Sequence, residues 1–243
     1  MVSRPSRFSM SMFDDAPPWV LVTRLFFGLG WIRAATEKLV DPYWWNGATI
    51  ERFLTEHVDL TLAWYRPFTE YVVAPQLDFV VVLVVALQLV AGVSLLTGRA
   101  LGLGLAIGIV LNLNFVAAGA VDPSAFYLVA QISLALWLVE SRPAPGGRRA
   151  LLCGTMIVVV LGVLSAPLVG TLHPAEVIDD PAVMFLTFAL LATVGTVAAI
   201  RRHQRASGRR SGQRRHQLVR HPADATRAIV VGHRPQQVET AAR

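Results

Sequence analysis

Six long apolar segments divide the chain, and each is close to the length of a helix that crosses a bilayer. About 20 helical residues span the hydrocarbon core, and only helices or closed barrels satisfy their backbone hydrogen bonds there. The alternation of apolar and polar residues typical of barrel strands is missing from these segments. The pattern therefore predicts an all-α, polytopic integral membrane helix bundle with spans at residues 19–39, 77–97, 100–119, 123–140, 150–169 and 182–200.

The longest segment between predicted spans, residues 41–76, is rich in tryptophan, tyrosine, proline and acidic residues. Within it, apolar residues recur at helical spacing from Ile50 to Leu60, which predicts an amphipathic helix over residues 49–64 lying on the membrane surface. The tryptophan and tyrosine side chains of this extracytoplasmic loop suit the headgroup level of a bilayer.

Basic and acidic residues fall on alternate sides of the predicted spans. One side receives Arg99 between the second and third spans, and the arginines of residues 1–17, 142–149 and 201–243. The other side receives ten acidic residues with only two arginines, Arg52 and Arg66. Because cytoplasmic loops carry the excess of lysine and arginine, we expect a cell membrane protein with both termini in the cytoplasm.

The composition agrees with a membrane location, since 54% of the residues are hydrophobic and only 16% are charged. The net charge of +6 is concentrated in one region, because 11 of the 22 basic residues follow Ile200. Residues 201–243 contain few apolar side chains, which predicts a basic, disordered cytoplasmic tail. We expect this tail to lie along anionic membrane lipid rather than to bind nucleic acid.

A few polar side chains lie within the predicted spans, where an ionised group costs at least about 2.5 kcal/mol. Arg33 and Glu37 are four residues apart, so they share a helix face and can neutralise each other. In the predicted orientation they lie in the extracytoplasmic half, as do Asn112 and Asn114, while Gln131 lies near mid-depth. We expect a site here, although Asn112 and Asn114, two residues apart, should point to nearly opposite faces and not enter one pocket.

Structural roles compete with this interpretation. Arg24 and Lys38 can extend their charged ends to the membrane surfaces. Amides between membrane helices also hydrogen-bond for packing alone, with an average contribution of about 0.6 kcal/mol.

Several cofactors are excluded by residue type. All six histidines lie outside the predicted spans, which excludes a b-type haem held within the membrane. The single cysteine, Cys153, excludes an iron–sulfur cluster built from this chain, and no histidine, cysteine or carboxylate spacing typical of a metal site is present. We therefore expect redox chemistry, where there is any, to use a diffusible quinone or a cofactor of a partner protein.

Three segments of the chain resemble the DoxX/DoxD family, whose DoxD members are the small membrane subunit of thiosulfate:quinone oxidoreductase. These segments are RLFFGLGWIRAATEKLVDPYWWNGATIERFL, LQLVAGVSLLTGRALGLG and LNLNFVAAGAVDPSAFYLV. The resemblance implies a four-helix DoxX-like core over residues 18–140, followed by two additional helices over residues 150–200. Many members have a glutamate where this chain has Gln88. The family positions fall on Arg24, Gly28, Trp31, Lys38, Pro42, Trp44, Gly92, Gly98, Asn112, Asn114, Phe115 and Gly119.

The resemblance implies a quinone-linked or redox-stress role, often with a separate soluble protein partner. In the leading hypothesis, Arg33 and Glu37 with an asparagine of the third span bind a quinone carbonyl, and Trp31 or Trp44 stacks on the ring. A non-catalytic membrane anchor that recruits a soluble enzyme is the alternative. A small-molecule permease is a third interpretation, which the lack of an internal repeat disfavours.

Overall fold

A computed structural model describes residues 16–141, 146–170, 173 and 177–220, with the backbone alone described for residues 203–220. The chain divides into two compact units, Met1–Thr196 and Val197–Arg243. The described residues form helices and the turns between them. The long helices are α2 (Pro18–Val40), α6 (Leu77–Thr97), α7 (Leu101–Ala117), α8 (Ser124–Ser141), α9 (Gly147–Ser165) and α10 (Pro181–Arg220).

Short helical elements connect α2 to α6 and extend α9. They are α3 (Pro42–Trp45), α4 (Ala48–Glu56), α5 (Arg66–Phe68), the π-helix η1 (Thr69–Val73), and the 3₁₀ helices η2 (Ala74–Gln76) and η3 (Ala166–Leu168).

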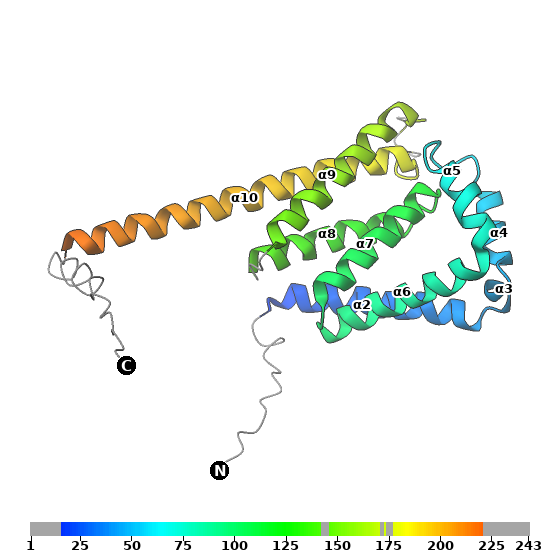
Figure 1. Cartoon of the computed structure of the whole chain (residues 1–243), viewed down its shortest axis with the longest axis horizontal. Coiled ribbons are helices and arrows are strands. Elements are labelled where there is room, and N and C mark those ends of the chain that lie inside the picture. The colour runs from blue at the N-terminus through cyan, green and yellow to red at the C-terminus, as the bar shows by residue number, and fades with distance from the viewer. Residues whose placement is uncertain (1–15, 142–145, 171–172, 174–176, 221–243) are drawn as a thin grey trace, which may run out of the picture. The chain divides into compact units, whose positions relative to one another are not determined.

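The first unit is a bundle in which consecutive long helices pack side by side (Figure 1). Helix α2 packs along α6, α6 along α7, and α7 along α8. Aromatic side chains close the ring, since Tyr127 of α8 lies edge-on to Phe27 and Trp31 of α2, with ring centroids 4.6 and 5.6 Å apart. The apolar core between these helices holds Phe27, Trp31, Leu95 and Leu105.

A second apolar cluster joins α9 and the first part of α10 to this ring. Phe185 and Phe188 of α10 are fully buried and pack with Leu128 of α8 and Val158 of α9. The hydroxyl oxygens of Thr155 and Thr196 lie 2.7 Å apart and link the same two helices. The two C-terminal helices are therefore part of the bundle as far as Thr196.

Four helical stretches among the described residues are long and apolar enough to cross a membrane, which confirms an all-helical membrane protein. They are Arg66–Thr97, Ser124–Ser141, Gly147–Leu168 and Pro181–Arg202. Two of the six predicted spans fall outside this set: α2 has four charged side chains, and α7 has only 17 residues.

Arg24 does not extend to a membrane surface, as one sequence interpretation allowed. Its side chain is 2% exposed, and its Nε donates a hydrogen bond of 3.1 Å to the carbonyl oxygen of Leu95. Leu95 is in the last turn of α6, where carbonyl groups lack helical partners and the helix dipole favours a cation. Arg24 therefore caps α6 from the neighbouring helix.

The amphipathic helix predicted over residues 49–64 is shorter than expected and ends at Glu56. The following residues turn toward the end of α7 because they supply hydrogen bonds to it. The backbone amide of Leu62 donates to the carbonyl of Ala117 at 3.0 Å, and the hydroxyl of Thr61 lies 3.2 Å from the carbonyl oxygen of Ala118. Continuing the helix would leave these carbonyls of α7 without partners.

Helix α10 is longer than the predicted span, because it continues to Arg220. Its first twenty residues beyond Ile200, predicted as the start of a disordered tail, are helical. Arginine, glutamine and alanine are good helix formers, and a helix already formed in the membrane removes the cost of nucleation. The rest of the predicted tail, residues 221–243, lies outside the described residues.

The tight contact between α2 and α6 predicts a test of the fold. A methyl group added at Gly92 would lie 2.8 Å from Cδ1 of Ile32 and 3.1 Å from the carbonyl oxygen of Gly28. Because that backbone cannot move away alone, Gly92→Ala should lower the free energy of unfolding by about 1 to 3 kcal/mol. The measurement is detergent-induced unfolding followed by circular dichroism.

Gly154→Ala is the matched control, since a methyl group there has no atom within 4 Å. Removing a glycine from the middle of α9 should leave stability unchanged or raise it by up to about 1 kcal/mol. Equal losses in both variants would contradict the close contact of α2 with α6.

Candidate functional site

A cavity of about 690 Å³ lies between α2, α6, α7 and α8. Helices α6 and α7 diverge from their short connection near Gly98 (Figure 1), and residues of both helices line the cavity where they are apart. Segments from α4 to η1 cover it. Phe79 of α6 and Val110 of α7 line the cavity and are 62% and 55% exposed.

The cavity wall is largely apolar, and two of its polar groups lack partners. Ile50, Val84, Leu87 and Phe115 are among the apolar lining residues. Trp31 and Gln88 also line it and are only 3% and 2% exposed. The indole Nε1 of Trp31 donates no hydrogen bond, and the amide Oε1 of Gln88 accepts none. Leaving each such group unpaired costs about 1 to 3 kcal/mol, and both atoms are enclosed by neighbouring side chains.

Asn112 and Asn114 both line this cavity, so the prediction that one pocket could not contain both was wrong. They do point in different directions. The Nδ2 of Asn112 donates to Oε1 of Gln131 on α8 at 3.1 Å, whereas Oδ1 of Asn114 accepts from the hydroxyl of Tyr65 at 2.8 Å. The cavity reaches both side chains because it extends around α7 from the bundle interior to the covering segment.

Tyr65 holds the covering segment, the residues from α4 to η1, against the bundle. Its hydroxyl bond to Asn114 joins the turn before α5 to α7, and burial raises the pKa of the Tyr65 phenol. The raised pKa keeps the phenol protonated, as donation to an amide oxygen requires. Asn114 is fully engaged, since its Nδ2 donates to the carbonyl of Val110 at 2.6 Å.

Arg33 and Glu37 form an ion pair at 2.7 Å, as their spacing predicted, but they do not reach into the bundle. Their side chains are 81% and 59% exposed. Glu37 is among the residues that line the cavity, and Arg33 is not. The pair turns outward because each charge neutralises the other on the helix surface, so neither needs a partner in the interior.

Trp44 and Lys38 define another part of the wall. The Nε1 of Trp44 donates to the carbonyl of Val81 at 3.1 Å, so this indole is already paired. The Nζ of Lys38 lies 5.0 Å from the centre of the Trp44 ring, a cation–π contact at the cavity edge. Trp31 and Trp44 were both predicted site residues, and only Trp31 keeps a free donor.

Gln131 is fully buried but does not line the cavity. Its Oε1 accepts from Asn112, while its Nε2 lies without a partner. The structure therefore brings together some of the predicted site residues. Those that line one cavity are Trp31, Glu37, Trp44, Asn112 and Asn114.

Two residues of this site, Gln88 and Tyr65, were not among the predicted site residues. Gln88 is a single amide in the middle of an otherwise apolar span, which is itself a signal of a buried polar role. Tyr65 had no comparable signal, because tyrosines of a membrane-surface loop usually lie at headgroup level.

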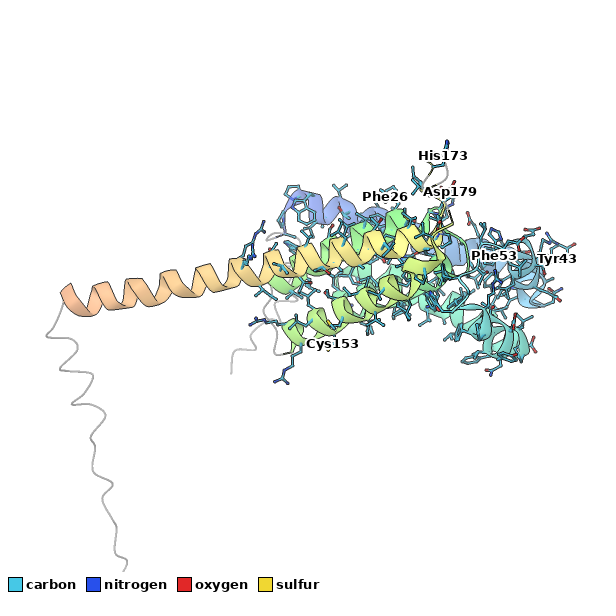
Figure 2. The ribbon with its side chains drawn as sticks, turned by 90° about the horizontal axis from the view of Figure 1, so that it is seen from above. Phe26, Tyr43, Phe53, Cys153, His173 and Asp179 are labelled. Atoms are coloured by element: carbon cyan, nitrogen blue, oxygen red, sulfur yellow. The ribbon has the colours of Figure 1, made fainter. Side chains whose placement is uncertain are left out.

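The ends of the bundle differ in side-chain chemistry. Figure 2 shows Tyr43 and Phe53 at the end that carries α3 and α4, and Cys153 near the other end. Phe53 lines the cavity, whereas Cys153 is exposed on α9 and does not. Within the part of the chain that the structure describes, no three histidine, cysteine or carboxylate side chains gather as a metal site would need.

Comparisons of the chain with protein-family models, with curated proteins and with solved structures return no match. The arguments on function below therefore rest on the cavity and on the residues of the sequence.

The bond between Tyr65 and Asn114 generates a prediction about stability. Tyr65→Phe keeps the ring and removes the hydroxyl, which leaves Oδ1 of Asn114 without its donor. We expect the free energy of unfolding to fall by about 1 kcal/mol, measured by thermal unfolding in detergent. Tyr71→Phe is the control, because the Tyr71 side chain is 75% exposed and should change stability little.

The raised pKa of Tyr65 adds a pH dependence with a definite sign. The unfolded chain releases the phenolic proton near pH 10 and the folded protein does so only at higher pH, so this contribution to stability is complete below about pH 10 and declines above it. Between about pH 9 and pH 11, wild-type protein should therefore lose more thermal stability than Tyr65→Phe. Parallel losses in the two proteins would contradict the burial of this phenol.

Proposed function

We propose that this protein is an integral membrane subunit of a quinone-linked oxidoreductase, with a role like that of DoxX/DoxD proteins, and that the cavity binds the quinone headgroup. The observation that carries the proposal is a largely apolar cavity wall that includes two residues, Trp31 and Gln88, each with one enclosed polar atom that has no partner within the protein. A volume of about 690 Å³ falls in the range of small-molecule sites, which are mostly apolar with a few oriented polar groups.

Each part of the wall has a definite task in this proposal. A bound quinone would supply a two-electron, two-proton redox couple. The indole of Trp31 would donate a hydrogen bond to a carbonyl oxygen of the headgroup. Apolar side chains such as Val84, Leu87 and Phe115 would hold the ring and exclude water. The exposed part of the wall at Phe79 and Val110 would be the entry point for a lipophilic molecule from the bilayer.

The proposal includes six spans in the cell membrane, with both termini in the cytoplasm. Charge supports this orientation, because Arg99, Arg148 and Arg149 lie at the ends of helices opposite the cavity, whereas Asp41 and Asp122 lie at its end. The capping bond of Arg24 and the outward ion pair on α2 support α2 as a span, since they compensate its charges. The cavity would then lie in the extracytoplasmic half.

We also propose that the subunit works with a protein partner, because exchange with the quinone pool requires a source or acceptor of electrons. The exposed Arg33 and Glu37 are better suited to contact such a partner than to bind a quinone inside the bundle. The basic residues after Ile200 are expected to lie against anionic lipid on the cytoplasmic side.

The donor role of Trp31 generates a direct test. Trp31→Phe retains an aromatic ring and removes the N–H group, so affinity for a short-chain quinone should fall about tenfold. The measurement is the rise in melting temperature of purified protein as the quinone is added, since a ligand of the folded state stabilises it by mass action. Trp45→Phe is the matched control, because Trp45 is exposed and does not line the cavity.

A second readout identifies the native ligand. Protein purified in mild detergent should retain a quinone that mass spectrometry detects in an organic extract. If the extract contains no quinone and added quinones leave the melting temperature unchanged, the quinone proposal is wrong. A non-catalytic anchor for a soluble enzyme would then be the better hypothesis, and co-purifying proteins would identify its partner.

A further inference from the structure

Among the described residues that line the cavity, Lys38 alone is basic. Its side chain is half-buried, and its Nζ lies 3.4 Å from the carbonyl oxygen of Ala34 and 5.0 Å from the centre of the Trp44 ring. Ala34 and Trp44 line the cavity as well. The ammonium group of Lys38 therefore lies beside two other residues of the wall.

The side chain of Lys38 turns back along α2 instead of extending past the end of the helix. Lys38 is two residues from Val40, where α2 ends, so its long stem could carry the charge outward to the membrane surface, as the sequence analysis considered. The contact with the carbonyl of Ala34, one turn earlier, holds the charge beside the cavity instead. A lysine charge held within a membrane helix and away from the surface is costly and indicates a functional role.

The carboxylates near Lys38 have other partners. Glu37 pairs with Arg33 at 2.7 Å, and Asp41 accepts hydrogen bonds from the start of α3 and from α4. Asp122 also lines the cavity, but it is exposed in the turn between α7 and α8. Among the described residues, no carboxylate forms an ion pair with Lys38.

A positive group on a largely apolar wall defines the chemistry of a ligand that fits it. An ammonium group has three N–H donors, and among the described residues only the carbonyl of Ala34 accepts from that of Lys38. Apolar side chains such as Phe53, Leu83 and Leu87 line the same cavity of about 690 Å³. We infer that the cavity binds a single-chain amphipathic anion, with its carboxylate or phosphate on Lys38 and its apolar chain along these residues.

This inference concerns the same cavity as the proposed function but does not depend on a quinone. Hydrogen bonds between charged partners are about twice as strong as neutral ones, and a less polar surrounding strengthens them. A neutral head group on the same chain keeps the apolar contacts and loses the charged bond. The anion should therefore bind about tenfold more tightly than its neutral analogue.

The experiment compares probes that share one chain and differ in the head group. Wild-type protein in a neutral detergent is titrated with dodecanoate and separately with dodecanol, at about pH 8, where the carboxylate is ionised. The rise in melting temperature reports binding, since a ligand of the folded state stabilises it. We expect dodecanoate to bind about tenfold more tightly. Dodecyl phosphate is titrated in the same way, and the tighter of the two anions identifies the class of head group.

Substitutions at Lys38 test its charge. Lys38→Met removes the charge and keeps an unbranched side chain, so this variant should bind dodecanoate and dodecanol equally. Lys38→Arg keeps the charge and should retain the preference for the anion. Arg52→Gln is the matched control, because it removes one positive charge from an exposed residue of α4 that does not line the cavity. It should retain the full preference.

The outcomes separate this inference from the quinone proposal. Wild-type protein that binds neither anion more tightly than the alcohol would overturn the inference, as would a Lys38→Met protein that keeps the preference. Both results leave the quinone proposal standing, because uncharged quinones and Trp31 test it. A protein without affinity for quinones would equally leave the anion site standing. If Lys38→Met does not fold, the wild-type comparison of the anions with the alcohol decides.

Discussion

The bundle depends on the close approach of α2 and α6 at Gly28 and Gly92. A methyl group at Gly28 would lie 2.8 Å from Cγ of Leu96 and 3.1 Å from its backbone nitrogen, so the two helices nearly touch along their backbones. In lipid there is little hydrophobic drive for helices to associate, and close packing at small residues supplies it instead. This contact sets the register in which Arg24 reaches the carbonyl of Leu95 and Trp44 reaches that of Val81.

The cavity follows from uneven packing between α6 and α7. At one end, a methyl group at Gly104 would lie 2.5 Å from Oγ of Ser94, and the same hydroxyl lies 2.8 and 2.9 Å from the carbonyl oxygens of Arg99 and Ala100. At the other end, the two helices lie farther apart (Figure 1), and residues of both line the cavity. The covering segment is held there by Tyr65 on Asn114 and by Leu62 on the end of α7. A tight contact at one end and a hydrogen-bonded cover at the other leave a cavity between these helices.

Hydrophobic patterning predicted the long helices well, because apolar runs bounded by glycine, proline and charged residues leave few alternatives to membrane-length helices. Three of the predicted site residues, Trp31, Asn112 and Asn114, line the cavity. The interior position predicted for Arg33 and Glu37 was wrong, since an i, i+4 pair can face either way and this pair is exposed. A signal was present in the helical period: Arg24, Phe27, Trp31 and Ala35 recur every three or four residues and are all buried, and Arg33 and Glu37 lie off that stripe. The Tyr65 bond to Asn114 could not be predicted, because it joins residues that come together only when the loop folds over α7.

The amides of this bundle show that its unpaired groups are not a general feature of its packing. Asn112 and Asn114 each have good partners although they border a cavity, and Gln131 has a partner for its oxygen. Trp44, an indole on the same wall as Trp31, donates to a backbone carbonyl. Most buried polar groups near the cavity thus have hydrogen-bond partners within the protein. A leucine at position 88 or a phenylalanine at position 31 would remove the two unpaired atoms without breaking a hydrogen bond of either atom. Buried polar groups that lower stability and form no hydrogen bond within the protein are expected at functional sites. Two of the three buried unpartnered atoms among the described residues belong to Trp31 and Gln88 of the cavity wall, which is why the cavity is the proposed ligand site.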